Sequence, residues 1–202
     1  MKSFDYRAKI ATVIAAAFAA AAPLTPASAE VLQFAGALDG SQEVPDPVIT
    51  DAFGDGLLLV DTVAQSVSFS LNVVGIDLDA LNDGLIANAD LGPVHLHNAG
   101  FGINGPIIVP FAFDSAAYQD TADGFSLTIT DFSFADAVAQ SGSMLTFNDF
   151  VNELIAGNFY INVHTDLFGG GEIRGQLSQV PAPGAIGLFL IGAGALRLFR
   201  RR

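Results

Sequence analysis

The chain has 202 residues, of which 51% are hydrophobic, enough for one domain with a single core plus targeting segments. It has no cysteine, so disulfide bonds, thiol catalysis and cysteine-ligated zinc are excluded. Residues 30–179 carry 20 Asp and Glu against the single Arg174, which excludes nucleic acid as a partner because phosphate binding requires Lys and Arg. This acidity suits the solubility of an exported protein, and weak binding of divalent cations is the alternative.

The first 29 residues are typical of a secretory signal peptide. Three basic residues lie within the first nine, an apolar run follows at residues 10–22, and Ala27-Ser28-Ala29 is a small-x-small cleavage site. The apolar run would reach only about 20 Å as a helix, too short for a hydrocarbon core of about 30 Å. We therefore expect export through the secretory translocon and a mature protein that starts at Glu30.

Short alternating runs predict an antiparallel β-sandwich over residues 30–179. In residues 67–74, for example, apolar side chains alternate with serine and asparagine, the period-two pattern of a strand with one buried face. Turn-rich connections of this length suit hairpins and meanders more than crossover helices. We expect strands at residues 31–38, 56–63, 67–74, 94–98, 107–113, 125–130, 158–165 and 172–177.

One helix is expected within this mainly β domain, at about residues 146–156. Thr146 with Asp149 approximates a capping box, and apolar side chains recur at helical spacing from Phe147 to Ile155. Gly157 follows at the position of a C-terminal cap. We expect the helix to pack across one end of the sandwich.

All three histidines lie on predicted strands. His95 and His97 are two residues apart, so their side chains project from one face about 6.6 Å apart along the backbone. With His164, on the polar face of its own strand, three imidazoles could hold copper or zinc and leave a coordination position open. The alternative is structural, with the rings hydrogen-bonded to the backbone and to Asp166 or Glu172.

The predicted terminal hairpin contains the only basic side chain between the two flanking segments. Gly169–Gly171 supplies its turn, and Glu172, Arg174 and Gln176 then share one face of the return strand. We expect Arg174 to lie outside the apolar core and to form an ion pair with a carboxylate, because it is one cation among about twenty carboxylates. Structural roles are assigned to Arg174, Glu172 and Glu43.

Three ordered blocks of the sequence resemble the CHRD domain, a family found in chordin and in many bacterial exported proteins. They read FAGALDGSQEVPDP at residues 34–47, PVHLHNAGFGINGPII at residues 93–108 and YINVHT…GEIRGQL within residues 160–177. Glycines stand at 169–171 where relatives often carry proline, so a looser turn is expected. The resemblance implies a β-sandwich module of an exported protein.

The segment after Gln179 is similar to the PEP-CTERM sorting signal of Gram-negative bacteria. Val180-Pro181-Ala182-Pro183 precedes the apolar residues 184–196, and Arg200, Arg201 and Arg202 close the chain. Ala182 replaces the glutamate of the motif. A helix of residues 184–199 would span about 24 Å, which fits a transient membrane anchor. The resemblance implies cleavage by an exosortase-type enzyme, with release from the cell or attachment to its surface.

Two hypotheses of different class describe the function. The first, implied by the family and the sorting signal, is a non-catalytic, surface-exposed or secreted module that binds an unidentified extracellular partner. The second is a histidine-ligated copper or zinc protein, with redox chemistry by analogy with the copper–zinc superoxide dismutases. The sequence contains no nucleophile elbow, phosphate-binding loop or dinucleotide motif, so no other enzyme class is indicated.

Overall fold

The computed structural model describes residues 30–81, 91–111 and 116–180. The predicted signal peptide and the predicted sorting residues from Pro181 to Arg202 lie outside these ranges. Ten strands of the described residues form one antiparallel sheet in the order β5-β4-β8-β9-β1-β2-β3-β7-β6, with β10 paired to β1 beside this path. The strands are β1 (Val31–Asp39), β2 (Phe53–Asp61), β3 (Ser66–Val74), β4 (Val94–Asn98), β5 (Ile107–Phe111), β6 (Tyr118–Asp120), β7 (Gly124–Ser133), β8 (Phe159–Val163), β9 (Ile173–Gln176) and β10 (Ser178–Val180).

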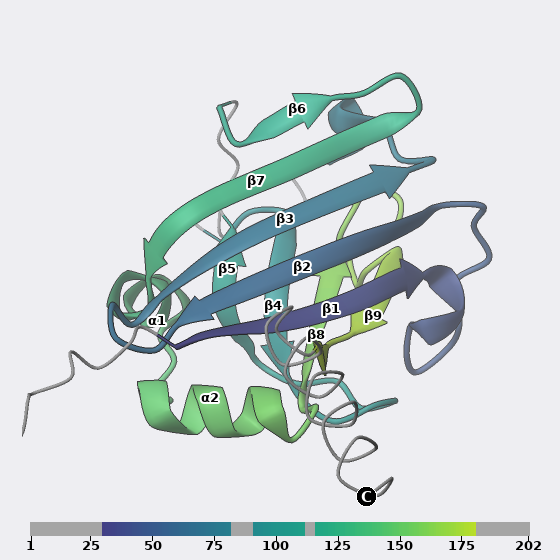
Figure 1. Cartoon of the computed structure of the whole chain (residues 1–202). Coiled ribbons are helices and arrows are strands. Elements are labelled where there is room, and N and C mark those ends of the chain that lie inside the picture. The colour runs from purple at the N-terminus through teal and green to yellow at the C-terminus, as the bar shows by residue number, and fades with distance from the viewer. Residues whose placement is uncertain (1–29, 82–90, 112–115, 181–202) are drawn as a thin grey trace, which may run out of the picture.

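The sheet curls until its two halves face each other. Figure 1 shows β1, β2, β3 and β7 crossing in front of β4, β5, β8 and β9. Phe69 of β3 stacks on Phe111 of β5 between the layers, with ring centroids 4.6 Å apart. The hydroxyl of Tyr118 on β6 donates a hydrogen bond of 2.7 Å to the carbonyl of Phe111, so the two edge strands are tied together. The predicted mainly antiparallel β architecture is confirmed, and its layers are halves of one curled sheet.

The front and back layers are joined where β9 crosses β1. In the antiparallel ladder, the backbone of Asp39 lies opposite the backbone of Arg174. Two glycines allow the backbones to approach closely at this point. A Cβ at Gly175 would lie 2.5 Å from the carbonyl oxygen of Ala37, and a Cβ at Gly36 would lie 2.9 Å from that of Gln176. Side chains at these two positions would therefore separate the layers.

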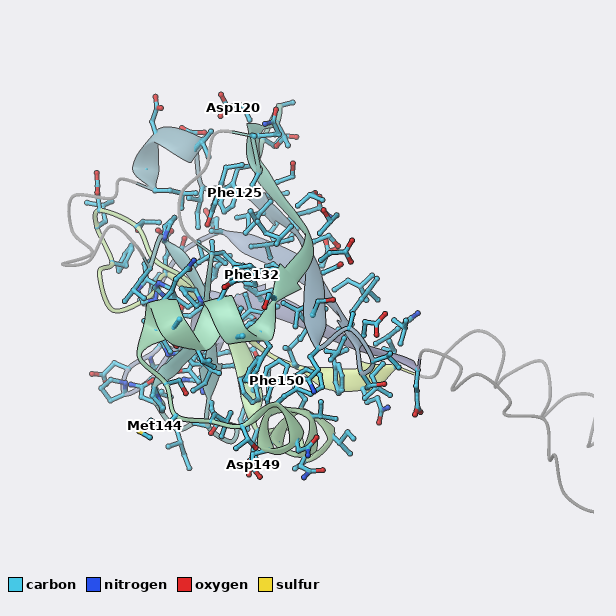
Figure 2. All side chains as sticks on the ribbon, turned by 90° about the vertical axis from the view of Figure 1, so that its left-hand side faces the viewer. Asp120, Phe125, Phe132, Met144, Asp149 and Phe150 are labelled. Atoms are coloured by element: carbon cyan, nitrogen blue, oxygen red, sulfur yellow. The ribbon has the colours of Figure 1, made fainter. Side chains whose placement is uncertain are left out.

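Two α-helices of the described residues cover one end of the core. The predicted helix forms as α2 (Phe147–Ile155), with the Thr146 hydroxyl accepting from the Asp149 amide and Gly157 at a φ of 76°. Figure 2 shows Phe150 pointing inward from α2 and Asp149 pointing away. The other helix, α1 (Phe134–Ser141), was not predicted. Neither helix has the length and apolar character that crossing a membrane requires.

Candidate metal centre

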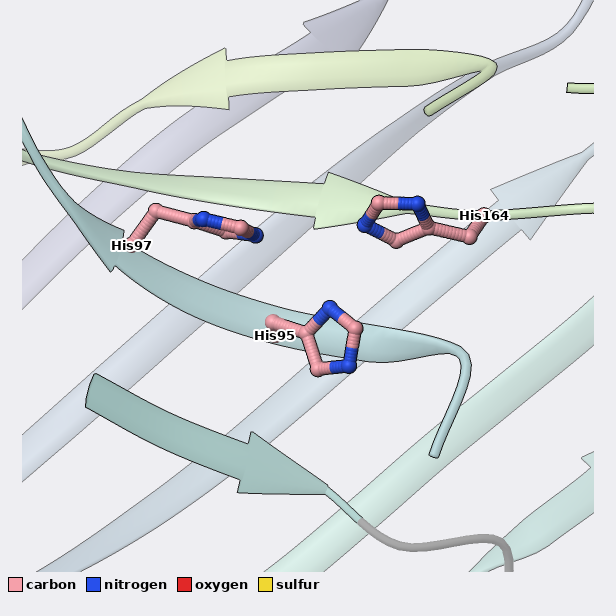
Figure 3. A group of neighbouring side chains, drawn as sticks. All are labelled: His95, His97 and His164. Atoms are coloured by element: carbon pink, nitrogen blue, oxygen red, sulfur yellow. The ribbon is translucent and has the colours of Figure 1, made fainter. Parts of the chain in front are cut away.

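Pairing of β4 with β8 places all three histidines on the same side of the sheet. The register sets His95 opposite Asn162 and His97 opposite Tyr160. His164 follows β8 directly, and its amide donates to the carbonyl of Pro93, which extends the pairing by one step. The apolar residues of these strands alternate with the histidines and face the core. Figure 3 shows the three rings converging beside β4 and β8.

The ligand atoms of the three rings are close enough to share one ion. One nitrogen from each of His95, His97 and His164 lies within 4.8 Å of the other two. Three such atoms always have a common point no more than about 2.8 Å from each, whereas zinc–imidazole bonds are about 2.0–2.1 Å. Movements of less than about 1 Å would therefore bring all three nitrogens to bonding distance. His95 is 1% exposed and His97 is 8% exposed, so water barely reaches these two rings.

Two of the rings are oriented by glycine carbonyls from the loops that cover them. Nδ1 of His97 lies 2.9 Å from the carbonyl oxygen of Gly105, and Nδ1 of His164 lies 2.9 Å from that of Gly169. Since a carbonyl can only accept, each Nδ1 carries the proton and each Nε2 has a free lone pair. Both Nε2 atoms are buried and have no hydrogen-bond partner among the described residues. This arrangement is the usual outer shell of a metal-ligating histidine.

His95 differs from the other two because neither of its ring nitrogens has a well-formed hydrogen bond to any residue that the structure describes. The backbone of Leu91 and Gly92 lies close enough to favour its charged form slightly, but not at hydrogen-bonding geometry. A β-bulge lies next to this region, because β5 has an extra residue between the partners of Leu96 and His97. Bulges of this kind commonly re-aim side chains at functional sites.

Burial keeps the histidines in the neutral form that binds metal. Burial lowers the pKa of His95 to about 3 and that of His97 to about 4, with the neighbouring histidine charges acting in the same direction. The pKa of His164 is also lowered by burial. The three rings are therefore uncharged at neutral pH, and no proton must leave before a metal binds.

The structural alternative for the histidines is met only by the backbone contacts of His97 and His164. The predicted partner Glu172 is engaged elsewhere, because its carboxylate accepts from the hydroxyl of Thr50 at 2.8 Å and from that of Thr165 at 2.7 Å. Asp166 is exposed. Hydrogen bonding within the described residues thus leaves the centre of the cluster unsatisfied, at a cost of about 1–3 kcal/mol for each unpaired buried group.

Arg174 lies on the predicted polar face, but it is buried and its predicted ion pair is not formed among the described residues. The side chain is 1% exposed. Its guanidinium donates to Asn104 Oδ1 at 3.0 Å and to the carbonyl of Ile103 at 2.7 Å, while Cζ lies 3.4 Å from the ring centroid of Tyr160. The expectation failed because the loop at residues 99–106 covers this face of the sheet. Arg174 therefore acts as an internal clamp for that loop.

Glu43 is the carboxylate that interacts electrostatically with Arg174, and its side chain is 4% exposed. Burial raises its pKa to about 7, although the charge of Arg174 acts in the opposite direction. Within residues 30–81, 91–111 and 116–180, neither its Oε1 nor Asn162 Oδ1 has a hydrogen-bond partner. A Cβ at Gly171 would collide with both groups, so the glycine leaves them room. Glu43, for which a structural role was predicted, is thus a buried carboxyl beside Gly171 and Asn162.

The sequence reasoning missed the neutral residues that complete this polar layer. Tyr160 stacks on His97, with ring centroids 4.8 Å apart and planes 7° from parallel. Its hydroxyl accepts from the Gly105 amide at 3.2 Å. Asn162 lies between His95 and Arg174 in the register. The alternation of Tyr160, Asn162 and His164 along one strand was the available signal, since these polar residues share a face.

Comparison with known proteins identifies the family of the chain. A family model described as the CHRD domain matches residues 34–177, which contain all three histidines, Glu43 and Arg174. Neither the curated proteins nor the solved structures include a detectable match to this sequence. The match covers more than half of the chain and coincides with the curled β-sheet. This chain therefore belongs to the CHRD domain family.

Proposed function

We propose that this protein is an exported β domain that binds one copper or zinc ion through His95, His97 and His164. The observation that carries the proposal is the convergence of three buried imidazole nitrogens within 4.8 Å. Imidazole suits both metals, and three such ligands leave a position open for a further ligand. The carbonyls of Gly105 and Gly169 supply the outer-shell support that such ligands require.

Metal content tests this proposal directly. The full-length protein is loaded with copper or with zinc, passed through a desalting column and measured by plasma mass spectrometry. We expect one equivalent of bound metal in the parent protein and clearly less in His97→Gln and in His164→Gln, because each variant removes one of the three ligands. Tyr160→Phe is the matched control, because it preserves a ring beside His97 and removes no imidazole. Equal metal binding by the histidine variants and the parent would overturn the proposal.

The non-catalytic surface module remains a second candidate, supported by the outer face of the front layer. A groove of about 190 Å³ lies there, lined by aliphatic and hydroxyl side chains of β2, β3 and β7 that include Leu57, Ser70 and Thr128. Leu57 is 38% exposed. Retention of the protein on the cells that produce it should fall for Leu57→Glu and persist for Asp55→Asn on the same strand. Unchanged retention of Leu57→Glu would mean that the groove does not support a function as a surface-binding module.

We also propose export and sorting, supported by the sequence of the two flanking segments. The signal peptide would be removed before Glu30, and an exosortase-type enzyme would cut near residues 180–183, leaving the domain at the cell surface or outside a Gram-negative cell. Intact-mass measurement on protein recovered from the native host should give a species of residues 30 to about 180. An extracellular species that keeps residues 184–202 would contradict the sorting proposal.

A further inference from the structure

The donor set of the histidine cluster has no negative charge to offer an ion. Its three members are neutral imidazoles, and no carboxylate of the described residues belongs to the group. Glu172, which was a candidate neighbour, is occupied by the hydroxyls of Thr50 and Thr165. The three ligands themselves therefore neutralise none of the charge of an ion that they bind.

The surroundings make a high charge costly. His95 and His97 are 1% and 8% exposed, so an ion between them would lose most of its hydration. The desolvation cost of an ion grows with the square of its charge, and a divalent ion therefore loses about four times as much as a monovalent ion of equal radius. The three neutral imidazoles set no negative charge against that cost.

The guanidinium of Arg174 is a buried cation close to the histidine cluster, separated from His97 by the ring of Tyr160. Tyr160 stacks on His97 from one side, and the guanidinium of Arg174 lies 3.4 Å from the centroid of the same Tyr160 ring. Because β8 lies between β4 and β9, the two side chains approach Tyr160 from opposite sides. Arg174 repels a divalent ion at the cluster twice as strongly as a monovalent ion at the same place. Glu43 compensates for this repulsion only in part, because its carboxyl is incompletely ionised at neutral pH.

We infer that the cluster of His95, His97 and His164 selects copper(I) over the divalent ions zinc(II) and copper(II). Copper(I) is the singly charged ion that imidazole nitrogens bind well, and it is stable with three ligands in a plane. This inference rests on the proposed function, since it specifies the charge of the ion that the same three residues hold. It assigns the buried arginine a second role, as an electrostatic selector.

Competition between metals tests the inference on the full-length protein. Copper(I) affinity is measured without oxygen against bicinchoninate, and zinc(II) and copper(II) affinities are measured against chelators of known strength. We expect copper(I) to bind at least about 100-fold more tightly than zinc(II). Zinc(II) or copper(II) binding as tightly as copper(I) would overturn the inference and leave the proposed metal centre intact. Failure of every ion to bind would instead overturn the proposed function.

Two variants separate the electrostatic role from a structural one. Arg174→Met should move the ratio of copper(I) to zinc(II) affinity toward zinc by about tenfold, because it removes the cation that penalises the divalent ion. Glu43→Gln should move the same ratio in the opposite direction and preserves the shape of the side chain. Loss of packing alone would weaken both ions together and leave the ratio unchanged. An unchanged ratio in Glu43→Gln, even if Arg174→Met does not fold, would count against the selector role.

Discussion

Arg174 is a buried cation whose hydrogen-bond acceptors are neutral. Its guanidinium holds the loop at residues 99–106 through Ile103 and Asn104, and its charge influences the carboxyl of Glu43. Removing a buried charged partner is costly because the groups that faced it remain buried without compensation. The free-energy cost of losing Arg174 therefore comes from the buried groups that would be left unpaired, which are the acceptors on Ile103 and Asn104 and the carboxyl of Glu43.

We predict that Arg174→Met lowers the free energy of unfolding by about 3–5 kcal/mol, as for other broken buried charge interactions. Urea unfolding followed by circular dichroism measures the change. The same substitution in a Glu43→Gln background should cost less, because a neutral amide replaces the carboxylate that loses its cation. An unfolding midpoint that does not move in either background would contradict the role of Arg174 in holding the loop at residues 99–106.

Acidification should destabilise the metal-free protein between about pH 6.5 and pH 4. His95 and His97 have folded pKa values of about 3 and about 4, below the ordinary value of 6.5, so in this window the unfolded chain binds protons that the folded chain does not. Each group removes about 1.4 kcal/mol per pH unit as the pH falls.

Glu43 opposes this trend. Its folded pKa of about 7 exceeds the ordinary 4.5, so its contribution is full below pH 4.5 and is lost as the pH rises toward 7. Two histidines outweigh one carboxyl, and the net result is a loss of stability on acidification. Urea unfolding from pH 8 to pH 4.5 measures the slope, which Glu43→Gln should steepen. A protein that gains stability over this range would refute the assignment of neutral buried rings.

Residue patterns predicted the face of each site residue better than its burial. Same-face spacing correctly placed His95 and His97 together, because alternation along a strand is fixed by the pleat. That His164 joins them depends on the pairing of β4 with β8, which the sequence did not predict. It did not show that the polar face of β8 and β9 is covered, since this depends on where the loops from residues 99–106 and 165–171 lie. The burial of Arg174 and the part played by Asn104 could not be read from any local pattern.

At the scale of the elements, the crossing of β9 and β1 is the junction that joins the two layers. We predict that Gly175→Ala destabilises the protein by about 1–3 kcal/mol, because the new methyl group would meet the backbone of Ala37 at 2.5 Å and a strand backbone cannot move aside cheaply. Thermal unfolding provides the measurement. Gly170→Ala is the matched control, since a Cβ there meets nothing within 4 Å. Equal melting temperatures for the two variants would contradict the account of the junction.

Element prediction succeeded where the signals were strong and agreed with one another. The β8–β9 hairpin and α2 formed as expected, because alternation, turn glycines and caps all indicated the same structure. The sequence did not predict the helix α1, because this helix begins immediately after the strand β7 and Ser133 makes no side-chain cap. Three-residue strands such as β6 and β10 are too short to show a period.

At the scale of the whole β domain, the acidic charge is almost uncompensated. Residues 30–179 contain 20 acidic side chains and one arginine, so mutual repulsion opposes the compact state. We predict that raising sodium chloride from about 10 mM to about 0.5 M increases the free energy of unfolding by on the order of 1 kcal/mol through screening. Choline chloride at equal ionic strength should increase the free energy of unfolding by a similar amount. A larger effect of calcium chloride at matched ionic strength would instead indicate specific cation binding, and destabilisation by salt would contradict the repulsion.

The three histidines lie on or directly after two strands that are far apart in the sequence. His95 and His97 precede His164 by more than sixty residues, and they become neighbours only when β4 pairs with β8. A growing or unfolded chain thus has no assembled centre with which to capture an ion. Under the proposed function, the metals available in the compartment where the chain completes its fold would help to determine which ion the protein acquires, alongside the chemistry of the ligands.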